Sequence, residues 1–376
     1  MILLFSVFFF LLIYSWMVYR KKLVYQSGSK TQNRSYLVGG IGLLVFLACF
    51  RGMNVGNDTF SYYKLFYFYT GQGTLQKVSA AGAEWMNSIE MGYQLLNKLV
   101  GLVTDNYQIF ISIISIFCYA VLARFIEKYS LNTALSVILV FLMFYGAYMN
   151  LLRQVLALSV VLIFFDALNK NKPVWFTIGV LLATVLFHRS AIICLLFLPM
   201  SRYQCKKGFM LFSAGVAGIA VLRGWIPRIL SLIGISTGYT SVVAGSSIIF
   251  AIIKNVCVFL FSWYLLNGRW KEDCHSLPKS DLNPIIADNL MSWIPFVCLL
   301  LSIGALALPV ATRFELYFSV FLVVFIPRMV GQSLRKSSNI RIALAGLLII
   351  LILYNAGKIV YRPEWTTEFQ YYFFWS

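Results

Sequence analysis

Long apolar stretches recur along the whole of this chain, and they constrain its fold more than any other feature. Of its 376 residues, 60% are hydrophobic and only 12% are charged, whereas soluble domains carry about a quarter charged residues. In lipid every backbone N–H and C=O must be hydrogen-bonded within the protein, which limits spanning elements to helices and closed barrels. The alternation of apolar and polar residues that marks barrel strands is absent. We therefore expect an all-α, polytopic transmembrane helical bundle that forms a single integral membrane domain over residues 1–376.

The apolar runs, compared with a hydrocarbon core about 30 Å thick, predict about 11–12 spans. Two of the runs, 173–187 and 189–201, are short, and they fit a hairpin that returns the chain to the face it left. The expected spans lie near residues 2–19, 36–50, 107–126, 131–149, 151–169, 173–187, 189–201, 208–223, 248–267, 285–308, 311–330 and 340–360.

The distribution of Lys and Arg between the spans predicts which helix ends face the cytoplasm. With the N-terminus outside, the inner connections hold nineteen basic residues and the outer ones ten. Short cytoplasmic loops are enriched in Lys and Arg, so this bias supports that sidedness. The net charge of +18 is then a topology signal, and nucleic acid is not an expected partner.

Neither the cysteines nor the N-terminus points to another class of protein. The seven cysteines are isolated, without the CxxC or Cys/His spacing of a zinc site and without the pattern of a disulfide framework. Residues 1–22 lack the leading basic segment and the small-residue cleavage site of a signal peptide, so we expect them to remain as the first span.

Two of the outer connections are long enough to carry structure of their own. The extracytoplasmic loop 51–106 ends with Met91, Leu95, Leu96, Leu99 and Leu102, the spacing of a helix whose apolar face lies on the membrane surface. Residues 224–247 form a second, Gly- and Ser-rich extracytoplasmic loop, which fits a flexible lid or a plain linker equally well.

Unusual polar residues gather on the expected outer side of the bundle. Three arginines from separate segments could meet at one anionic group, because a guanidinium binds phosphate through two hydrogen bonds and stays charged. The alternative for each arginine is an interface residue that reaches out to water. A spacing of three or four residues separates Asn150 from Arg153 and Gln154, and it predicts that the three lie on one polar helix face. The set comprises Arg51, Asp58, Glu90, Asn150, Arg153, Gln154, His188, Arg189, Arg313 and Tyr317.

Three of these residues are candidates for a general base, which must reach the proton it removes. Asp58 and Glu90 fit that role or the role of salt-bridge partners for the arginines. His188, one of only two histidines, is either a base or a hydrogen-bond donor. The aromatic residues of the first loop, which include Tyr62, Trp85 and Tyr93, fit an interfacial belt or a platform for sugar rings.

Five motifs in order resemble those of the EpsG family. They are "FRGMNVGNDTFSYYKLF", "EMGYQLLNKLV", "YMNLLRQVLALSVVL", "LFHRSAII" and "RFELYF", and they extend from residue 50 to residue 318. One departure is "NDT", where the family pattern often has Gly-Thr-Asp, so Asp58 is kept but its neighbour differs.

The resemblance implies a Wzy-type polymerase of bacterial surface polysaccharide, which is O-antigen, capsule or exopolysaccharide. It places the protein in the bacterial inner (plasma) membrane. It also implies a helical fold similar to that of lipid-dependent glycosyltransferases and O-antigen ligases. Such an enzyme transfers the growing glycan from undecaprenyl pyrophosphate to a sugar hydroxyl of a new lipid-linked repeat unit, on the outer face of the membrane. Its expected partners are the lipid-linked donor and acceptor and the membrane lipid, with a chain-length regulator as a further candidate.

The implied reaction assigns roles to the residues already singled out. Preorganised cations would stabilise the charge that grows on the departing pyrophosphate. We expect no metal and no cofactor, because no carboxylate cluster for a divalent metal is apparent. In this hypothesis Asp58 is the first candidate for the base, and His188 and Glu90 are the others. The pyrophosphate is bound by Arg51, Arg153 and Arg313, and substrate is oriented by Asn150, Gln154, Tyr62, Tyr93 and Tyr317.

Three other functions remain open from the sequence. A flippase for lipid-linked oligosaccharides would also bind phosphate through arginines, but its polar residues should line a path through the bilayer. An O-antigen ligase would hand finished glycan to another lipid. A non-catalytic scaffold of an assembly complex would have no use for the polar set. Lys254, in the middle of an expected span, either contributes to the cleft or reaches out to the interface.

Overall fold

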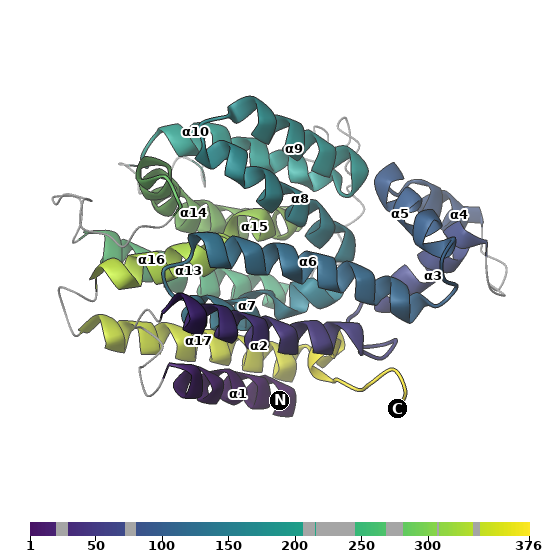
Figure 1. The fold of residues 1–376 in the computed structure, drawn as a ribbon, viewed down its shortest axis with the longest axis horizontal. Helices are drawn as coiled ribbons and strands as arrows, with labels where there is room; N and C mark the ends of the chain where they lie inside the picture. Colours follow the sequence, from purple (N-terminus) through teal and green to yellow (C-terminus); the bar gives the residue numbers. More distant parts are fainter. Residues whose placement is uncertain are drawn as a thin grey trace.

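The computed structural model confirms an all-helical bundle. It describes residues 1–19, 29–71, 80–205, 215, 245–267, 281–306, 308–333 and 339–376. Most of its helices run side by side along the long axis of the molecule, and the short helices between residues 59 and 101 project at one end (Figure 1). The bounds of the long helices are α1 Ile2–Val18, α2 Lys30–Cys49, α6 Tyr107–Tyr129, α7 Thr133–Asn150, α8 Leu152–Asn169, α9 Pro173–Leu186, α13 Gly245–Asn267, α14 Pro284–Gly304 and α17 Asn339–Tyr361.

Among the described residues, six helices are long and apolar enough to cross a membrane, and a seventh span results if the bent pair α15 (Ala311–Ser319) and α16 (Leu322–Ser333) is counted as one. These candidates are α6, α7, α8, α13, α14 and α17, while α1 and α9 are apolar but shorter. Eleven of the twelve expected ranges contain helix where the sequence placed it. The remaining one, 208–223, lies outside the described residues apart from residue 215, and so does the loop 224–247 apart from its last three residues.

Helix boundaries follow from local polar residues and from one sharp turn. Asn106 and Asn132 cap α6 and α7, because their side-chain oxygens accept hydrogen bonds from backbone N–H groups of the first turn. Between α7 and α8 only Leu151 leaves the helical conformation, with φ −103° and ψ 51°. The polar residues around position 150 therefore lie at a helix junction rather than inside one helix.

The two short runs at 173–201 form the predicted hairpin. After α9 the chain turns at His188 into a 3₁₀ helix, η1 (Arg189–Leu196), which continues as α10 (Phe197–Arg202). The 3₁₀ segment packs back against α9 and also contacts α15. This turn brings His188 to the end of the bundle at which the helices of residues 59–101 lie.

The first long loop contains three helices, α3 (Thr59–Thr70), α4 (Ala80–Asn87) and α5 (Met91–Gly101), which project together at one end (Figure 1). Helix α5 buries Tyr93 and Asn97 and exposes Met91, Leu95 and Leu99, so most of the predicted apolar stripe faces outward. Its placement on a membrane surface stays a prediction.

The C-terminal segment returns to this same end of the molecule (Figure 1). After α17 two short 3₁₀ turns, η4 (Pro363–Trp365) and η5 (Thr367–Phe369), lead into an extended tail. The Gly52 N–H donates to the Tyr372 carbonyl at 2.9 Å, and the Phe374 N–H donates to the Phe50 carbonyl at 3.1 Å. The tail is thereby joined to the loop that follows α2 and leads to Asp58.

Candidate active site

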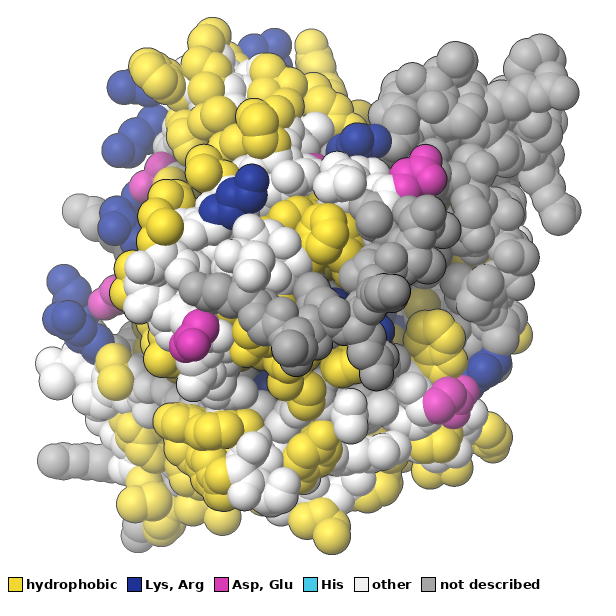
Figure 2. All heavy atoms as spheres, turned by 90° about the vertical axis from the view of Figure 1, so that its right-hand side faces the viewer, with side chains coloured by type: hydrophobic (Ala, Val, Ile, Leu, Met, Phe, Trp, Pro, Cys, Tyr) yellow, Lys and Arg dark blue, Asp and Glu magenta, His cyan; other side chains and the backbone are white. Residues whose placement is uncertain are grey.

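A polar pocket with a cavity of about 270 Å³ lies between α3, α4, the start of α8, the turn before η1, and α15. It is at the end of the bundle that faces the reader in Figure 2, where hydrophobic side chains gather along the upper and lower edges and charged ones are scattered between them. The pocket brings together charged and polar side chains from segments far apart in the sequence. Its lining comprises Asp58, Ser61, Tyr62, Leu65, Trp85, Leu151, Arg153, Gln154, His188 and Arg313.

Arg153 enters the pocket from the first turn of α8 and is held by Glu90. A terminal guanidinium nitrogen of Arg153 donates to Glu90 Oε2, and the two side chains are only 17% and 9% exposed. Glu90 Oε1 accepts a second hydrogen bond from the Arg189 backbone N–H at 3.2 Å. Both Glu90 oxygens are therefore engaged, which fits the salt-bridge alternative for this carboxylate better than a role as base.

Arg313 and Gln154 join α15 to α8 at the pocket wall. The Gln154 side-chain amide donates to the Arg313 backbone carbonyl, while Gln154 Oε1 is buried without a hydrogen-bond partner among the described residues. Gln154 also lines the pocket, so its side chain connects the pocket wall to α15.

Asp58 lies at the N-terminus of α3, but its carboxylate does not cap that helix. The side chain lines the pocket instead. Burial raises the pKa of Asp58 above its usual value near 3.8, and the guanidinium groups of Arg313 and Arg153 oppose that rise. A carboxylate with a raised pKa beside two cations is suited to accept a proton near neutral pH.

His188 is the pocket residue that the hairpin supplies. Its Nδ1 accepts a hydrogen bond from the Ser190 backbone N–H at 3.3 Å and also contacts Ser190 Oγ. Ser190 Oγ in turn lies 3.2 Å from the hydroxyl of Tyr317, which is fully buried. Burial lowers the pKa of His188 to about 3, and the positive charges of Arg153 and Arg313 add to that effect.

Asn150 supports the site from behind. The expectation that it shares a helix face with Arg153 and Gln154 is wrong, because α7 ends at Asn150 and the chain turns at Leu151 before α8 begins. Asn150 Oδ1 accepts from the Asn57 backbone N–H, and its amide donates to Glu368 Oε2 at 3.2 Å. It thus fixes the loop before Asp58 to the C-terminal tail.

The structure does not bring three other predicted residues to the pocket lining. Arg51 is buried where α2 ends, and one terminal nitrogen donates to the Ala48 carbonyl at 3.2 Å and contacts Met149 Sδ at 3.3 Å. Tyr93 is fully buried, and its ring packs edge-on against Tyr62. Tyr317 also stands behind the pocket, where it reaches Ser190 rather than the cavity.

Lys254 neither lines the pocket nor reaches out to an interface. Its ammonium donates to Glu315 Oε1 at 2.9 Å, with the two side chains 8% and 9% exposed. The pair joins α13 to α15, two residues beyond Arg313. The buried Lys254 therefore forms an ion pair that the sequence did not suggest.

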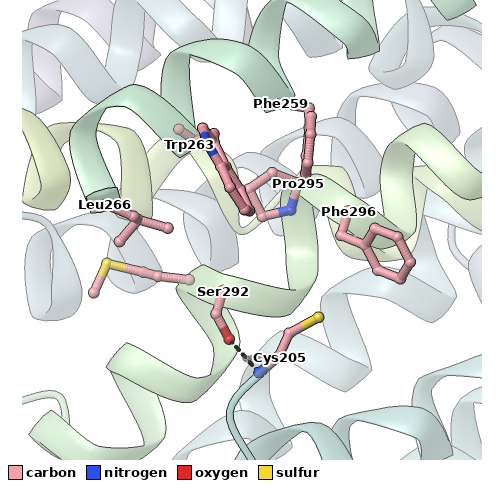
Figure 3. A pocket seen from close by; sticks show the side chains of 9 residues that line it. Cys205, Phe259, Trp263, Leu266, Ser292, Pro295 and Phe296 are labelled. Carbon is pink, nitrogen blue, oxygen red and sulfur yellow. Dashed lines mark hydrogen bonds between the residues drawn. The ribbon is translucent and has the colours of Figure 1, made fainter. Parts of the chain in front are cut away.

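A second, apolar pocket lies between α13 and α14 (Figure 3). Phe259, Trp263 and Pro295 form its walls, and the Cys205 backbone N–H donates to Ser292 Oγ at 3.0 Å. Its cavity of about 20 Å³ has room for little more than one water molecule. Because a sugar does not fit there, the polar pocket is the better candidate for chemistry.

Several contributors to the site were not singled out from the sequence. Ser190 lies within the "LFHRSAII" motif, so its spacing of two residues from His188 was the available signal. Trp85 was named only as one of the aromatic residues of the first loop, and nothing in its spacing distinguished it from the others. Glu368 and Thr367 of the tail had no signal, because their partners, Asn150 and Asn57, are more than 200 residues away. No group of three or more His, Cys, Asp or Glu side chains in the described part of the chain is arranged to hold a metal ion.

The fold and the pocket together define a multi-pass helical membrane protein with an arginine-containing polar site at one end of the bundle. The EpsG family model matches residues 36–374, nearly the whole chain. The chain belongs to the EpsG family, a Wzy-like family of polysaccharide biosynthesis. No curated protein and no solved structure matches it, so the expected likeness to lipid-dependent glycosyltransferases and O-antigen ligases stays a prediction.

Proposed function

We propose that this protein is a polymerase of bacterial surface polysaccharide. It transfers the growing glycan from undecaprenyl pyrophosphate to a sugar hydroxyl of a new lipid-linked repeat unit, on the outer face of the bacterial inner membrane. The observation that carries the proposal is the convergence of Arg153, Arg313, Asp58, Gln154 and His188 in one pocket. Membership of the EpsG family supports the same conclusion.

The pocket residues fit a direct displacement at the anomeric carbon. The acceptor hydroxyl oxygen attacks the anomeric carbon. The bond between this carbon and the pyrophosphate oxygen breaks, and its electron pair leaves with undecaprenyl pyrophosphate. Asp58 takes the proton of the hydroxyl. The reaction inverts the anomeric centre, because the new bond forms opposite the one that breaks.

The two pocket arginines act on the leaving group. Arg153 and Arg313 stabilise the negative charge that develops on the pyrophosphate, and a site shielded from water strengthens that interaction. Glu90 holds Arg153 in place, and Gln154, at the pocket wall beside Arg313, orients the sugar. No step needs a metal ion, and metal independence is therefore part of the proposal.

One difference in placement favours a transferase over a flippase. The charged groups of the pocket come from helix ends and connecting turns at one end of the bundle, whereas a translocation path would need them along the bilayer depth. The buried charged pair deeper in the bundle, Lys254 and Glu315, is mutually neutralised. A ligase would use the same chemistry, and the acceptor alone distinguishes it.

Reconstitution with lipid-linked repeat units tests the proposal. A polymerase lengthens the glycan on the lipid carrier, and the products form a ladder of repeat units on a gel. Movement of unchanged units across the bilayer would instead identify a flippase, and transfer of glycan only to a different lipid would identify a ligase. Removal of divalent cations with a chelator should leave chain extension unchanged.

A further inference from the structure

The hydrogen bonds around His188 determine which of its ring nitrogens carries a proton. A backbone N–H can only donate, so the bond from the Ser190 N–H requires an unprotonated Nδ1. Ser190 Oγ must then also donate to Nδ1, and the hydroxyl of Tyr317 donates to Ser190 Oγ. A neutral ring with a bare Nδ1 carries its proton on Nε2.

The surroundings of His188 oppose a second proton on the ring. Protonation of Nδ1 would remove both hydrogen bonds from Ser190 and place a third positive charge beside Arg153 and Arg313. The nearby carboxylate of Glu90 is already engaged by Arg153 and by the Arg189 N–H, and Asp58 faces the same arginines across the pocket. The lowered pKa of His188, about 3, agrees with this geometry.

We propose that Tyr317 and Ser190 form a relay that fixes His188 as a hydrogen-bond donor, so that its Nε2–H, and not a basic nitrogen, faces the substrate. The inference rests on the proposed function and deepens it. It makes His188 a residue that binds a phosphate or sugar oxygen, and it leaves Asp58 as the base. Ser190 and Tyr317 are positioning residues, because they act through the imidazole.

A glutamine at position 188 separates the two roles of this histidine. The amide nitrogen of glutamine can replace the Nε2–H donor, but glutamine cannot take up a proton at neutral pH. We expect His188→Gln to extend glycan within about tenfold of the wild-type rate, and His188→Ala to fall well below it. Extension by His188→Gln as low as that of His188→Ala would overturn the donor role.

Nitrogen-15 NMR of the imidazole tests the relay without any substrate. The chain has only two histidines, so His275→Gln leaves His188 as the single imidazole signal and is also the matched control for His188→Gln. We expect a protonated Nε2, an unprotonated Nδ1 and no titration between pH 8 and about pH 5. A protonated Nδ1, or titration near pH 6.5, would refute the relay even if polymerisation is confirmed.

Variants of Ser190 test its contribution. Ser190→Ala keeps the backbone N–H but loses one hydrogen bond, for which we expect a drop of about fivefold in extension and the appearance of some Nδ1–H tautomer. Ser190→Thr keeps the hydroxyl and should restore the single tautomer. A wild-type spectrum for Ser190→Ala would exclude its hydroxyl from the relay. If wild-type protein shows this spectrum but never extends glycan, the proposed function fails and the relay stands.

Discussion

Replacement of Arg153 by lysine isolates the catalytic part of the Arg153–Glu90 pair. A lysine keeps the positive charge that Glu90 needs, but it lacks the planar fork with which arginine holds two oxygens of a phosphate. The loss of one preorganised donor to a developing negative charge typically lowers kcat by about 100- to 1,000-fold. We expect Arg153→Lys to lose chain extension to that extent while its thermal unfolding temperature stays close to wild type.

Replacement of Arg153 by alanine should affect both activity and stability. It would leave the Glu90 side chain, only 9% exposed, as an uncompensated buried charge, which costs about 3–5 kcal/mol. The double variant Arg153→Met with Glu90→Gln removes both charges, so it should recover the unfolding temperature but not the activity. Extension of lipid-linked glycan and thermal unfolding in detergent measure the two effects separately. Wild-type extension by Arg153→Lys would remove this guanidinium from the mechanism.

Three further predictions concern Asp58 and two buried carboxylates. Asp58→Asn should lower glycan extension about 100- to 10,000-fold, and retained turnover would show that another residue is the base. Because burial raises the pKa of Asp58, the activity of the wild-type protein should fall on the acid side at a pH above 3.8. Lys254→Met should destabilise the protein by about 3–5 kcal/mol because it leaves the buried Glu315 without its partner, whereas the double variant Lys254→Met with Glu315→Met should be close to neutral. An equal loss of unfolding free energy in the single and the double variant would contradict the ion pair. Burial also raises the pKa of Glu368 above its usual value near 4.5. The folded state therefore binds the proton of this carboxyl group more tightly than the unfolded state does, and the free energy of unfolding falls as the pH rises above about 4.5. Glu368→Gln should therefore raise the unfolding temperature at pH 7 but not at pH 4. An equal gain at both pH values would show that it does not come from the cost of ionising this buried carboxyl group.

The sequence by itself determined the class of fold and most of the helix positions. Long apolar runs leave a chain in lipid with little choice but helices, since each backbone polar group must then bond within its own segment. The shortness of two runs predicted the hairpin at 173–201, and the spacing of apolar residues predicted the helix at 91–102. The sequence placed the boundary between two spans near residue 150, but it assigned Asn150 to the face of the following helix, whereas Asn150 is the last residue of α7.

Only the tertiary structure decided which polar residues meet. Arg51 and Arg313 looked alike in the sequence, yet Arg313 lines the pocket and Arg51 is enclosed beside Met149. The engagement of Glu90 by Arg153 depends on how α5 packs beside the end of α9, and the tautomer of His188 depends on a tyrosine from α15. Burial and hydrogen-bond partners set the chemistry of an ionisable group, and both come from segments distant in the chain.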